Sequence, residues 1–525
     1  GDVNGDGVVD VIVGSPYADP EVGTTRINAG ISYVLFGRSL SVNGASSSYT
    51  NIELQPLNTA GSVLGFAILG AVANDYCGYS VSGAGDVNGD GLSDVIVGAY
   101  GGDPAVSGAT RNGAGISYVI FGRLYSTGSA SYANIDLLPL NSGGSSLGFS
   151  IMGAAANDIS GWSVSAAGDV NGDGLSDVIV GANQASPVVN GTVRSSAGIS
   201  YVVFGRSKAL NLTGSCTNID LLPLNSAGSA LGFAILGAVN SDQSGRSVRT
   251  TGDMNGDGIS DVIVGAPYAR VVVSGTTRTS AGMVYVIFGR NITTNPVGSY
   301  ANIDLLPLNS AGSTLGFVIL GAVANDLTAR LGAAGDVNGD GLSDVIVGTN
   351  NADPVVGGST RTNAGMSYVL FGRSKATNMT ASHANIDLLA INTAGSVLGF
   401  AIIGAAAGDG NGYAVSTAGD VNGDGLADVI VGAYSADPVI SVTTRTNAGI
   451  SYVLFGRRIY AGDPTAYHKN IDLAAISPII GFRILGAVGG DQSGWSVGAA
   501  GDMNQDGLAD VIVGANNHAG VGASS

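Results

Sequence analysis

Residues 85–98 read GDVNGDGLSDVIVG, and closely similar stretches recur along the whole chain. The first Asp of each copy is separated from the next by 84, 83, 84, 83, 84 and 82 residues. A period this constant indicates one structural module that is copied in tandem. We therefore expect residues 1–525 to form a single domain of tandem repeats of about 83 residues, with incomplete first and last units.

Each repeat contains four short runs that are bounded by Gly, Asn, Asp or Pro and are typical of β-strands. In the second repeat these runs are Gly78–Ser82, Asp94–Gly98, Ile116–Arg123 and Leu147–Gly153. The Val-Ile-Val runs lack polar alternation, which indicates strands that are buried on both faces. Helices are not expected, because the 85 glycines would weaken them.

Four strands in each repeat predict an all-β fold, a β-propeller of four-stranded blades. A stacked β-solenoid is the competing fold, but its coils are usually much shorter than this period. The chain holds seven Val-Ile-Val runs and six of each other type, which makes 25 strands. Seven complete blades need 28 strands and six need 24, so seven blades with incomplete ends are favoured and six remain the alternative.

The acidic stretch follows the pattern Asp-x-Asn-x-Asp-Gly-x-x-Asp, and all seven copies are complete. Oxygen ligands at positions 1, 3 and 5, with a main-chain carbonyl at position 7, suit a hard cation, and Gly at position 6 permits the sharp turn. Calcium tolerates such a crowded, irregular oxygen shell better than magnesium does. We expect about seven Ca²⁺ sites, one in the loop of each blade, with these ligands: Asp2, Asn4, Asp6 and Asp10; Asp86, Asn88, Asp90 and Asp94; Asp169, Asn171, Asp173 and Asp177; Asp253, Asn255, Asp257 and Asp261; Asp336, Asn338, Asp340 and Asp344; Asp420, Asn422, Asp424 and Asp428; Asp502, Asn504, Asp506 and Asp510.

The alternative is that Asp, Asn and Gly simply make turns. Three carboxylates in each of seven loops account for 21 of the 39 acidic residues, and like charges this close repel one another. Seven Ca²⁺ ions would change the net charge from −18 to −4. The loop differs from an EF-hand or dockerin loop, since position 12 is Val13, Val97 or Val180 where those loops carry an acid.

The repeats resemble FG-GAP repeats, the units of the integrin α-subunit β-propeller and of many large microbial extracellular proteins. The resemblance is carried by Gly78-Tyr79-Ser80-Val81 before the loop, the nine-residue acidic motif, Gly265-Ala266-Pro267-Tyr268 after it and the Gly-x-x-Tyr-Val-x-Phe run. It covers essentially the whole chain and implies a propeller with calcium between strands one and two of each blade. Integrins carry such loops in only some blades, and no inserted metal-dependent adhesion domain is visible here, so integrin-type ligand recognition is not carried over.

Composition excludes several other classes of protein. A hydrophobic fraction of 45% with 11% charged residues excludes intrinsic disorder, and two cysteines in 525 residues exclude a disulfide scaffold. The net charge of −18 argues against a nucleic-acid partner. The longest apolar stretches are about half the roughly 20 residues that a transmembrane helix requires. The first residues are not a signal peptide, which suggests a mature product or an excerpt of a longer chain.

A catalytic site should break the symmetry of the repeats, and no such constellation is found. The three histidines, His383, His468 and His518, have no partner at metal-ligand spacing and are expected to be solvated. Cys77 takes the place of Ser160 and Ser244, and a disulfide bridge to Cys216 is not expected. Trp162 and Trp495 replace Tyr79 and Tyr413, so blade packing is a better interpretation of these tryptophans than a platform for binding a ligand. The deviant approach to the fifth loop, Ala329-Arg330-Leu331-Gly332, indicates locally altered packing.

Two regular sets of arginines recur with the repeat. They could contact an anionic glycan or a neighbouring subunit, but surface ion pairs are common, so pairing with recurrent acids such as Asp75, Asp158, Asp242, Asp326 and Asp491 is the favoured interpretation. The sets are Arg26, Arg111, Arg194, Arg278, Arg361 and Arg445, and Arg38, Arg123, Arg206, Arg290, Arg373 and Arg457.

Four N-glycosylation sequons, at Asn190, Asn211, Asn291 and Asn378, are no more than chance provides in a chain this rich in Asn, Ser and Thr. Whether they are used depends on the source of the protein.

The sequence thus predicts a non-enzymatic, calcium-binding structural or adhesion protein, secreted or at the cell surface. Extracellular calcium modules bind at roughly 10⁻⁴–10⁻³ M, so cytosolic calcium would leave such loops empty. The expected partners are calcium and either another copy of the chain, which could build a fibre or surface array by strand addition, or an extracellular protein or glycan. The alternatives are an accessory propeller of a larger secreted enzyme and a ligand-binding receptor propeller.

Overall fold

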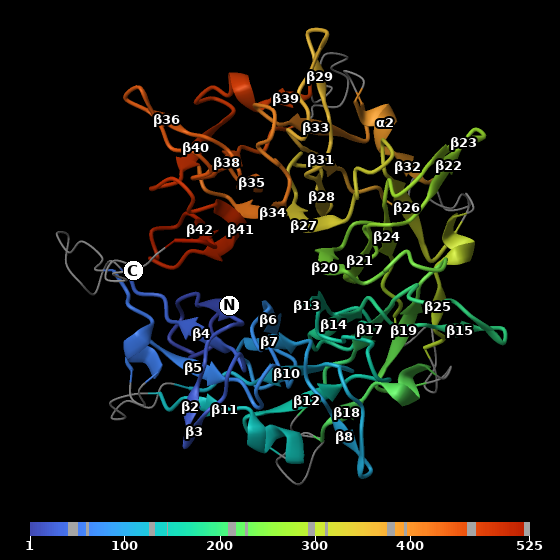
Figure 1. The fold of residues 1–525 in the computed structure, drawn as a ribbon, viewed down its shortest axis with the longest axis vertical. Coiled ribbons are helices and arrows are strands. Elements are labelled where there is room, and N and C mark those ends of the chain that lie inside the picture. Colours follow the sequence, from blue (N-terminus) through green and yellow to red (C-terminus); the bar gives the residue numbers. More distant parts are fainter. Residues whose placement is uncertain are drawn as a thin grey trace. The chain divides into compact units, whose positions relative to one another are not determined.

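The computed structural model describes residues 1–39, 51–58, 62–124, 132–143, 145–207, 217–225, 229–291, 300–309, 313–374, 384–392, 396–458 and 469–518. The chain packs into two compact units (Figure 1). The first unit contains Gly1–Thr250, Phe288–Pro307 and Asp502–Asp506, and the second contains Thr251–Ile287, Leu308–Gly501 and Gly507–Ser525. The prediction of a single domain over residues 1–525 stays a prediction.

Four long strands recur in the repeats at the places predicted from the sequence. The strand before the acidic loop is β6 (Ser80–Gly85), β13 (Ser163–Gly168), β20 (Ser247–Gly252), β27 (Arg330–Gly335), β34 (Ala414–Gly419) or β41 (Ser493–Gly501). The strand after the loop is β1 (Val11–Ser15), β7 (Asp94–Ala99), β14 (Asp177–Ala182), β21 (Asp261–Ala266), β28 (Asp344–Thr349), β35 (Asp428–Ala433) or β42 (Asp510–Ala515).

The third and fourth strands complete each sheet. The third is β4 (Ile31–Leu35), β10 (Ile116–Ile120), β17 (Ile199–Val203), β24 (Met283–Ile287), β31 (Met366–Leu370) or β38 (Ile450–Leu454). The fourth is β5 (Gly65–Leu69), β12 (Gly148–Met152), β19 (Gly232–Leu236), β26 (Gly316–Leu320), β33 (Gly399–Ile403) or β40 (Gly481–Leu485). The described residues thus contain seven strands of the second type and six of each other type, as expected.

Short elements fill the connections that the sequence left unassigned. A two-residue strand follows the third strand in the chain: β11 (Ile135–Asp136), β18 (Ile219–Asp220), β25 (Ile303–Asp304), β32 (Ile386–Asp387) and β39 (Ile471–Asp472). Single-turn helices come next: η1 (Gln55–Asn58), η2 (Leu138–Ser142), η4 (Leu222–Asn225), η5 (Leu306–Asn309), α2 (Leu388–Ile391) and η7 (Leu473–Ala475). Small hairpins extend from the loop after the second strand: β2–β3 (Glu21–Val22, Thr24–Thr25), β8–β9 (Ala105–Val106, Ala109–Thr110), β15–β16 (Val188–Val189, Thr192–Val193), β22–β23 (Val271–Val273, Thr276–Arg278), β29–β30 (Val355–Val356, Ser359–Thr360) and β36–β37 (Val439–Ile440, Thr443–Thr444).

The sheets of the first unit have the orders β1-β4-β5-β11, β6-β7-β10-β12-β18 and β13-β14-β17-β19-β25. Those of the second unit include β21-β24-β26-β32, β27-β28-β31-β33-β39, β34-β35-β38-β40 and β41-β42. The four long strands pair antiparallel, so that Tyr118 of β10 lies opposite Val97 of β7 and Ser150 of β12. Seven repeating units with sheets of four to five strands agree with a seven-bladed β-propeller, the predicted fold class.

The hydrophobic core of each unit lies between the sheets of consecutive repeats. In the first unit, Phe121 and Phe149 of the second repeat pack with Val180 and Tyr201 of the third. In the second unit, an equivalent cluster is formed by Val369, Phe371, Phe400, Val431 and Tyr452. The Val-Ile-Val strand is buried along its whole length in β7, because sheets cover both of its faces. The absence of polar alternation in these runs was therefore a correct signal of burial.

A β-bulge directs the chain from the first strand into the acidic loop at β6, β13, β27, β34 and β41. In β6 the pairing with β7 shifts between Gly83 and Gly85, and Gly85 has a φ of +72°. A left-handed residue at a bulge bends the strand and costs a glycine little. The Gly before the loop is therefore as much a part of the motif as the Asp residues that follow it.

Candidate metal centres

The acidic loops lie where the sequence placed them, between the first and second strand of a blade. The loop of the third repeat starts after β13 and ends at Asp177, the first residue of β14. The seventh loop is divided between the two units, with Asp502–Asp506 in the first and Asp510 in the second. We therefore describe the loops that lie within one unit.

Main-chain amides of the loop hold its first carboxylate. In the third repeat Asp169 Oδ1 accepts a hydrogen bond from Gly172 N at 2.6 Å, and its Oδ2 accepts one from Gly174 N at 2.9 Å. Asn171 Oδ1 accepts from Asp173 N at 2.8 Å. Both glycines are left-handed, with φ of +72° and +88°. The loop is thus a series of Asx turns that gathers the side chains of positions 1, 3 and 5.

The ninth-position Asp ties the loop to the sheet beneath it. Asp177 Oδ2 accepts from Val170 N at 2.9 Å and its Oδ1 accepts from Gly205 N at 2.8 Å, and the side chain is fully buried. Burial raises the pKa of Asp177 to about 8, the two main-chain hydrogen bonds oppose the rise, and Asp173 and Asp169 add to it. Burial likewise raises the pKa of the equivalent carboxyls, to about 6 in Asp10, 7 in Asp94, 8 in Asp344 and 6 in Asp428.

The third-position Asn provides a test of whether a cation fits the loop. Asn88 is fully buried, and neither its Oδ1 nor its Nδ2 has a hydrogen-bond partner; Asn255 Oδ1 is also buried without one. Such orphaned oxygens are rare in folded proteins and fit a ligand to a hard cation. Within the described residues no three Asp, Glu, His or Cys side chains are placed to hold a metal. Binding therefore requires the carboxylate oxygens to close in on a shared centre with the Asn oxygen.

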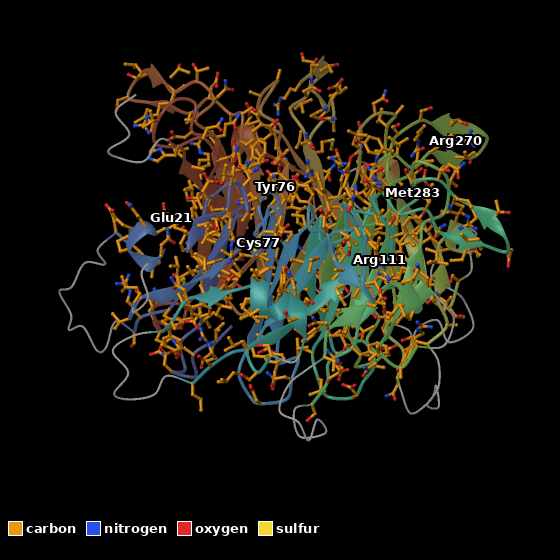
Figure 2. The ribbon with its side chains drawn as sticks, turned by 60° about the horizontal axis from the view of Figure 1, so that its bottom comes forward. Glu21, Tyr76, Cys77, Arg111, Arg270 and Met283 are labelled. Atoms are coloured by element: carbon orange, nitrogen blue, oxygen red, sulfur yellow. The ribbon has the colours of Figure 1, made fainter. Side chains whose placement is uncertain are left out.

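Five of the six arginines in the first recurrent set form ion pairs among the described residues, but not with the acids that the sequence suggested. Arg26 Nη1 lies 2.7 Å from Asp136 Oδ1 and also donates to Gly70 O at 2.8 Å. Asp75 is buried in a turn, where it accepts from Val72 N, so the prediction of Asp75 and its equivalents as the partners is wrong. Further pairs of the same kind, each with an N–O distance of 2.6 Å, are Arg111–Asp220 (Arg111 is labelled in Figure 2), Arg194–Asp304, Arg278–Asp387 and Arg361–Asp472.

The second set of arginines packs consecutive repeats together. Arg123 N donates to Val3 O in the preceding acidic loop at 2.8 Å, and its guanidinium lies 4.6 Å from the centre of the Phe66 ring. Cation–π contacts of this kind recur for Arg206 over Phe149, Arg290 over Phe233, Arg373 over Phe317 and Arg457 over Phe400. Arg38 N donates to Met503 O, also at 2.8 Å. These contacts support packing rather than glycan binding.

The other singled-out residues also have structural roles. Cys77 is a free, buried thiol at the position of Ser160, inside the first unit (Figure 2); Cys216 lies outside the described residues. Trp162 packs on Tyr79 and Tyr100, which confirms the packing interpretation. Matching contacts join Trp495 to Tyr413 and Tyr434, and the guanidinium of Arg330 lies 4.2 Å from the Tyr413 ring centre.

The histidines and sequons are only partly described. His518 is exposed, as expected for a solvated histidine, and its Nδ1 lies 3.0 Å from Asp491 Oδ1; His383 and His468 lie outside the described residues. The sequon residue Asn190 is exposed at the turn of the β15–β16 hairpin, and Asn291 is partly buried. The remaining sequons, at Asn211 and Asn378, lie outside the described residues.

The sequence did not predict the residues that connect consecutive repeats. We call each such connection, an Asn-Ile-Asp segment paired with the preceding sheet and its arginine, a joint. Asn134, Ile135 and Asp136 recur as Asn-Ile-Asp in later repeats, and that recurrence was the available signal. Asn134 Oδ1 accepts from Ala67 N at 2.9 Å, and Asp136 receives Arg26, as described above. The Ser/Asn/Leu connection is therefore a structural element of the preceding sheet.

The FG-GAP repeat family model matches seven segments: residues 1–35, 78–120, 160–203, 244–287, 329–370, 411–454 and 493–525. Together they cover more than half of the chain and include every acidic loop. The chain belongs to the FG-GAP repeat family. The resemblance inferred from the motifs is thereby confirmed.

Part of this FG-GAP chain is similar to phosphatidylinositol-glycan-specific phospholipase D. The mouse (Mus musculus) protein is 34% identical over 140 residues, 26% of this chain and 14% of that protein. The cattle (Bos taurus) and rat (Rattus norvegicus) proteins are 31% and 32% identical over 35% and 36% of this chain, and 18% and 20% of their own lengths. The matched segments thus span no more than a fifth of these relatives. Among the described residues, no helix has the length and apolar character to cross a membrane.

Proposed function

We propose that this FG-GAP chain is a calcium-binding, non-enzymatic structural or adhesion protein that works outside the cell. The observation that carries the proposal is the seven-fold recurrence of one complete oxygen-ligand loop. The buried, unpartnered Asn88 oxygen supports it, because an oxygen in that position lacks the hydrogen bond that water or protein would otherwise give it. Calcium would bind the carboxylate and amide oxygens of positions 1, 3, 5 and 9 and a main-chain carbonyl.

The role of the ion in this proposal is mechanical. Bound calcium would cancel the repulsion among three carboxylates and fix the loop that connects the first two strands of a blade. Extracellular calcium modules bind at roughly 10⁻⁴–10⁻³ M, which matches extracellular and not cytosolic calcium. Near-identical repeats present the same surface many times, and that favours an array or a multivalent contact over a unique reaction centre.

The second candidate is an accessory propeller of a larger secreted enzyme. The similarity to part of phosphatidylinositol-glycan-specific phospholipase D favours it, since that relative is named for an enzymatic activity. In this role the calcium loops would serve the same mechanical purpose, and the catalytic groups would stand elsewhere. Hydrolysis of a glycan-linked phosphatidylinositol by the isolated chain would contradict the non-enzymatic proposal.

Thermal unfolding of the full chain tests the calcium proposal, with about 2 mM Ca²⁺, with the same concentration of Mg²⁺, and with excess EGTA. At that concentration mass action adds about 0.6–1.8 kcal/mol per site, so several sites together should raise the melting temperature strongly. Magnesium should give a much smaller rise, because the loop does not offer it octahedral geometry and retained waters. Equal melting temperatures in calcium and EGTA would mean that the loops are ordinary turns that do not bind calcium.

A further inference from the structure

Consecutive acidic loops within a unit are joined to each other by direct hydrogen bonds. The main-chain N–H of position 8 in one loop donates to the position-1 carbonyl of the loop before it. Between the second loop (residues 86–94) and the third (169–177), this bond runs from Ser176 N to Asp86 O at 2.9 Å. Equivalent bonds, of 2.9 to 3.0 Å, run from Ser93 N to Asp2 O, Ser343 N to Asp253 O, Ala427 N to Asp336 O and Ala509 N to Asp420 O. The contact recurs in both units and does not depend on the side chain at position 8.

A second connection passes through the segment that follows the third strand of a blade. Gly205 N donates to Asp177 Oδ1 at 2.8 Å, and the next amide, Arg206 N, donates to Val87 O of the second loop, also at 2.8 Å. Two adjacent N–H groups therefore bridge the ninth-position carboxylate of the third loop and the main chain of the second. The same pair of bonds is made by Gly122 and Arg123, by Gly372 and Arg373, and by Gly456 and Arg457.

The leucine at position 7 adds an apolar contact between the loops. Leu175 of the third loop packs over Gly89 of the second, so closely that a β-carbon at Gly89 would lie 3.0 Å from Leu175 Cδ2. Gly89 N donates to Asp86 Oδ1, so the leucine covers the turn that holds a proposed ligand. Contacts of the same kind join Leu92 to Gly5, Leu342 to Gly256, Leu426 to Gly339 and Leu508 to Gly423.

The connections end on residues that are proposed ligands or adjoin them. Asp86 would supply the position-1 carboxylate of the second loop, and its own carbonyl accepts the bond from the third loop. Ser176 stands between Leu175, whose carbonyl is the proposed position-7 ligand, and Asp177, the ninth-position ligand. The main chain that positions the ligands of one loop is therefore bonded to the main chain that positions those of the next.

We propose that the acidic loops of one unit bind calcium with positive cooperativity, through these contacts between consecutive loops. Binding in one loop would fix the main chain to which the next loop is bonded, so the next loop would lose less conformational freedom when it binds. The inference rests on the proposed calcium binding and describes its regulation. Its consequence is that the loops of a unit fill together, over a narrower range of calcium concentration than independent loops would.

Long-range electrostatics opposes this coupling. An empty loop carries three carboxylates and attracts calcium toward its neighbour, whereas a filled loop keeps one net negative charge and attracts it less. The position-5 residues Asp90 and Asp173 are exposed, so salt screens this effect, with a Debye length of about 8 Å at 0.15 M. Direct hydrogen bonds and packing persist in salt. We therefore expect the contacts to outweigh the electrostatic effect at physiological ionic strength.

Hydrogen exchange of the full chain, read by mass spectrometry of peptides from each loop, tests the proposal at about 0.01 to 10 mM Ca²⁺, a range around the affinities of extracellular modules. Each loop then gives its own midpoint, the calcium concentration at half-maximal protection. Asp90→Ala removes a ligand of the second loop and should raise the midpoint of the third loop about fivefold, the lower end of typical coupling. The matched variant Asp340→Ala, in the fifth loop, should raise the midpoint of the sixth loop and leave that of the third, in the other unit, unchanged.

A second set of variants removes a contact and keeps the ligands. Ser176→Pro lacks the N–H that donates to Asp86 O, whereas Ser176→Ala keeps it, as Ala427 does in the sixth loop. Adding Asp90→Ala to the proline variant should shift the third loop's midpoint by about twofold or less, and adding it to the alanine variant should give the full fivefold shift. Leu175→Ala keeps the main chain intact and should also reduce the shift, which covers the case in which the proline prevents folding.

The outcomes separate this inference from the proposed function. Calcium-dependent protection with a third-loop midpoint that Asp90→Ala leaves unchanged would overturn the coupling and leave calcium binding intact. A shift that keeps its full size in both Ser176→Pro and Leu175→Ala would also overturn the coupling, because these contacts would not transmit it. An absence of calcium-dependent protection in every loop would overturn the proposed calcium binding, and the coupling with it.

Discussion

The repeats contain two kinds of carboxylate site, the joint and the acidic loop, and they are stabilised in opposite ways. In the joints one carboxylate meets one guanidinium, as in Arg194–Asp304 with an N–O distance of 2.6 Å. In the loops three carboxylates stand within nine residues, as in Asp169, Asp173 and Asp177, and their hydrogen bonds come from main-chain amides and, at Asp173, also from the side-chain amide of Asn171. Amides satisfy hydrogen bonding but bring no positive charge.

The difference shows which part of the fold depends on its surroundings. In a joint the negative charge of the carboxylate is neutralised by an arginine of the same chain, so no ion from solution is required. A loop brings like charges together, which repel one another, and within the described residues no ion pair joins the carboxylates of Asp169, Asp173 and Asp177 to a lysine or arginine in the way that Arg194 pairs with Asp304. The repeat therefore combines a self-sufficient contact between blades with a connection inside each blade that a cation would complete.

The largest expected effect of a single substitution is at a ninth-position Asp. Asp177→Ala removes the acceptor of two buried N–H groups, Val170 N and Gly205 N, together with a proposed calcium ligand. We expect a loss of about 2–5 kcal/mol in the free energy of unfolding in calcium buffer, because each unsatisfied buried donor costs about 1–3 kcal/mol. Chemical denaturation measures it.

Asp177→Asn is the matched control for the ligand alone, since the amide keeps one acceptor oxygen and removes the charge. Asp177→Asn should lower the free energy of unfolding measurably in calcium buffer. The decrease should be smaller in EGTA, where the substitution also relieves repulsion from Asp173. An equal decrease in the free energy of unfolding in both buffers would mean that Asp177 acts only as a hydrogen-bond acceptor. The proposed difference between loops and joints would then be wrong.

A smaller effect is expected in the joint. Arg194→Met leaves the Asp304 carboxylate without its guanidinium and removes the donor to Gly237 O, so we expect a loss of about 1–3 kcal/mol. The loss should be the same in calcium and EGTA, because the joint lies outside the loops. Arg194→Lys keeps the charge but not the paired hydrogen bonds and should cost less. A joint variant whose cost depended on calcium would show that loops and joints are coupled.

The smallest effect concerns pH. The hydrogen bond from Arg361 lowers the pKa of Asp472, and partial burial opposes this. A carboxyl whose pKa is lower in the folded state stabilises the fold above its unfolded pKa, about 3.9, and loses that contribution as pH falls through the folded value. The difference in unfolding free energy between wild type and Asp472→Asn should thus be about 1 kcal/mol near neutral pH and should decrease as the pH falls below the unfolded pKa of about 3.9. A difference that instead grows on acidification would contradict the assigned pair.

The sequence predicted the long strands well, because their apolar runs are local signals. Val95, Ile96 and Val97 are buried on both faces in the structure, as the lack of alternation indicated. The acidic loops were also placed correctly, since Gly85 and Asp86 mark the bulge and the turn within a few residues of each other.

The joints were not predicted, because they depend on contacts between distant parts of the chain. The strand β11 has only two residues, Ile135 and Asp136, too few to give a periodic signal. Arg26 lies 110 residues before its partner Asp136, and Asp75 recurs with the same period, so spacing could not choose between the two acids. Only the three-dimensional arrangement shows that Asp75 is occupied within its own turn.

The most direct test of the account is a count of bound calcium. The full chain would be stripped with chelator, dialysed against about 2 mM Ca²⁺, a concentration at or above the usual affinity of extracellular modules, and analysed by atomic emission for calcium per chain. We predict close to seven ions per chain, matching the seven loops, and close to six for Asp177→Ala. A wild-type chain that retains no calcium at this concentration would contradict the account.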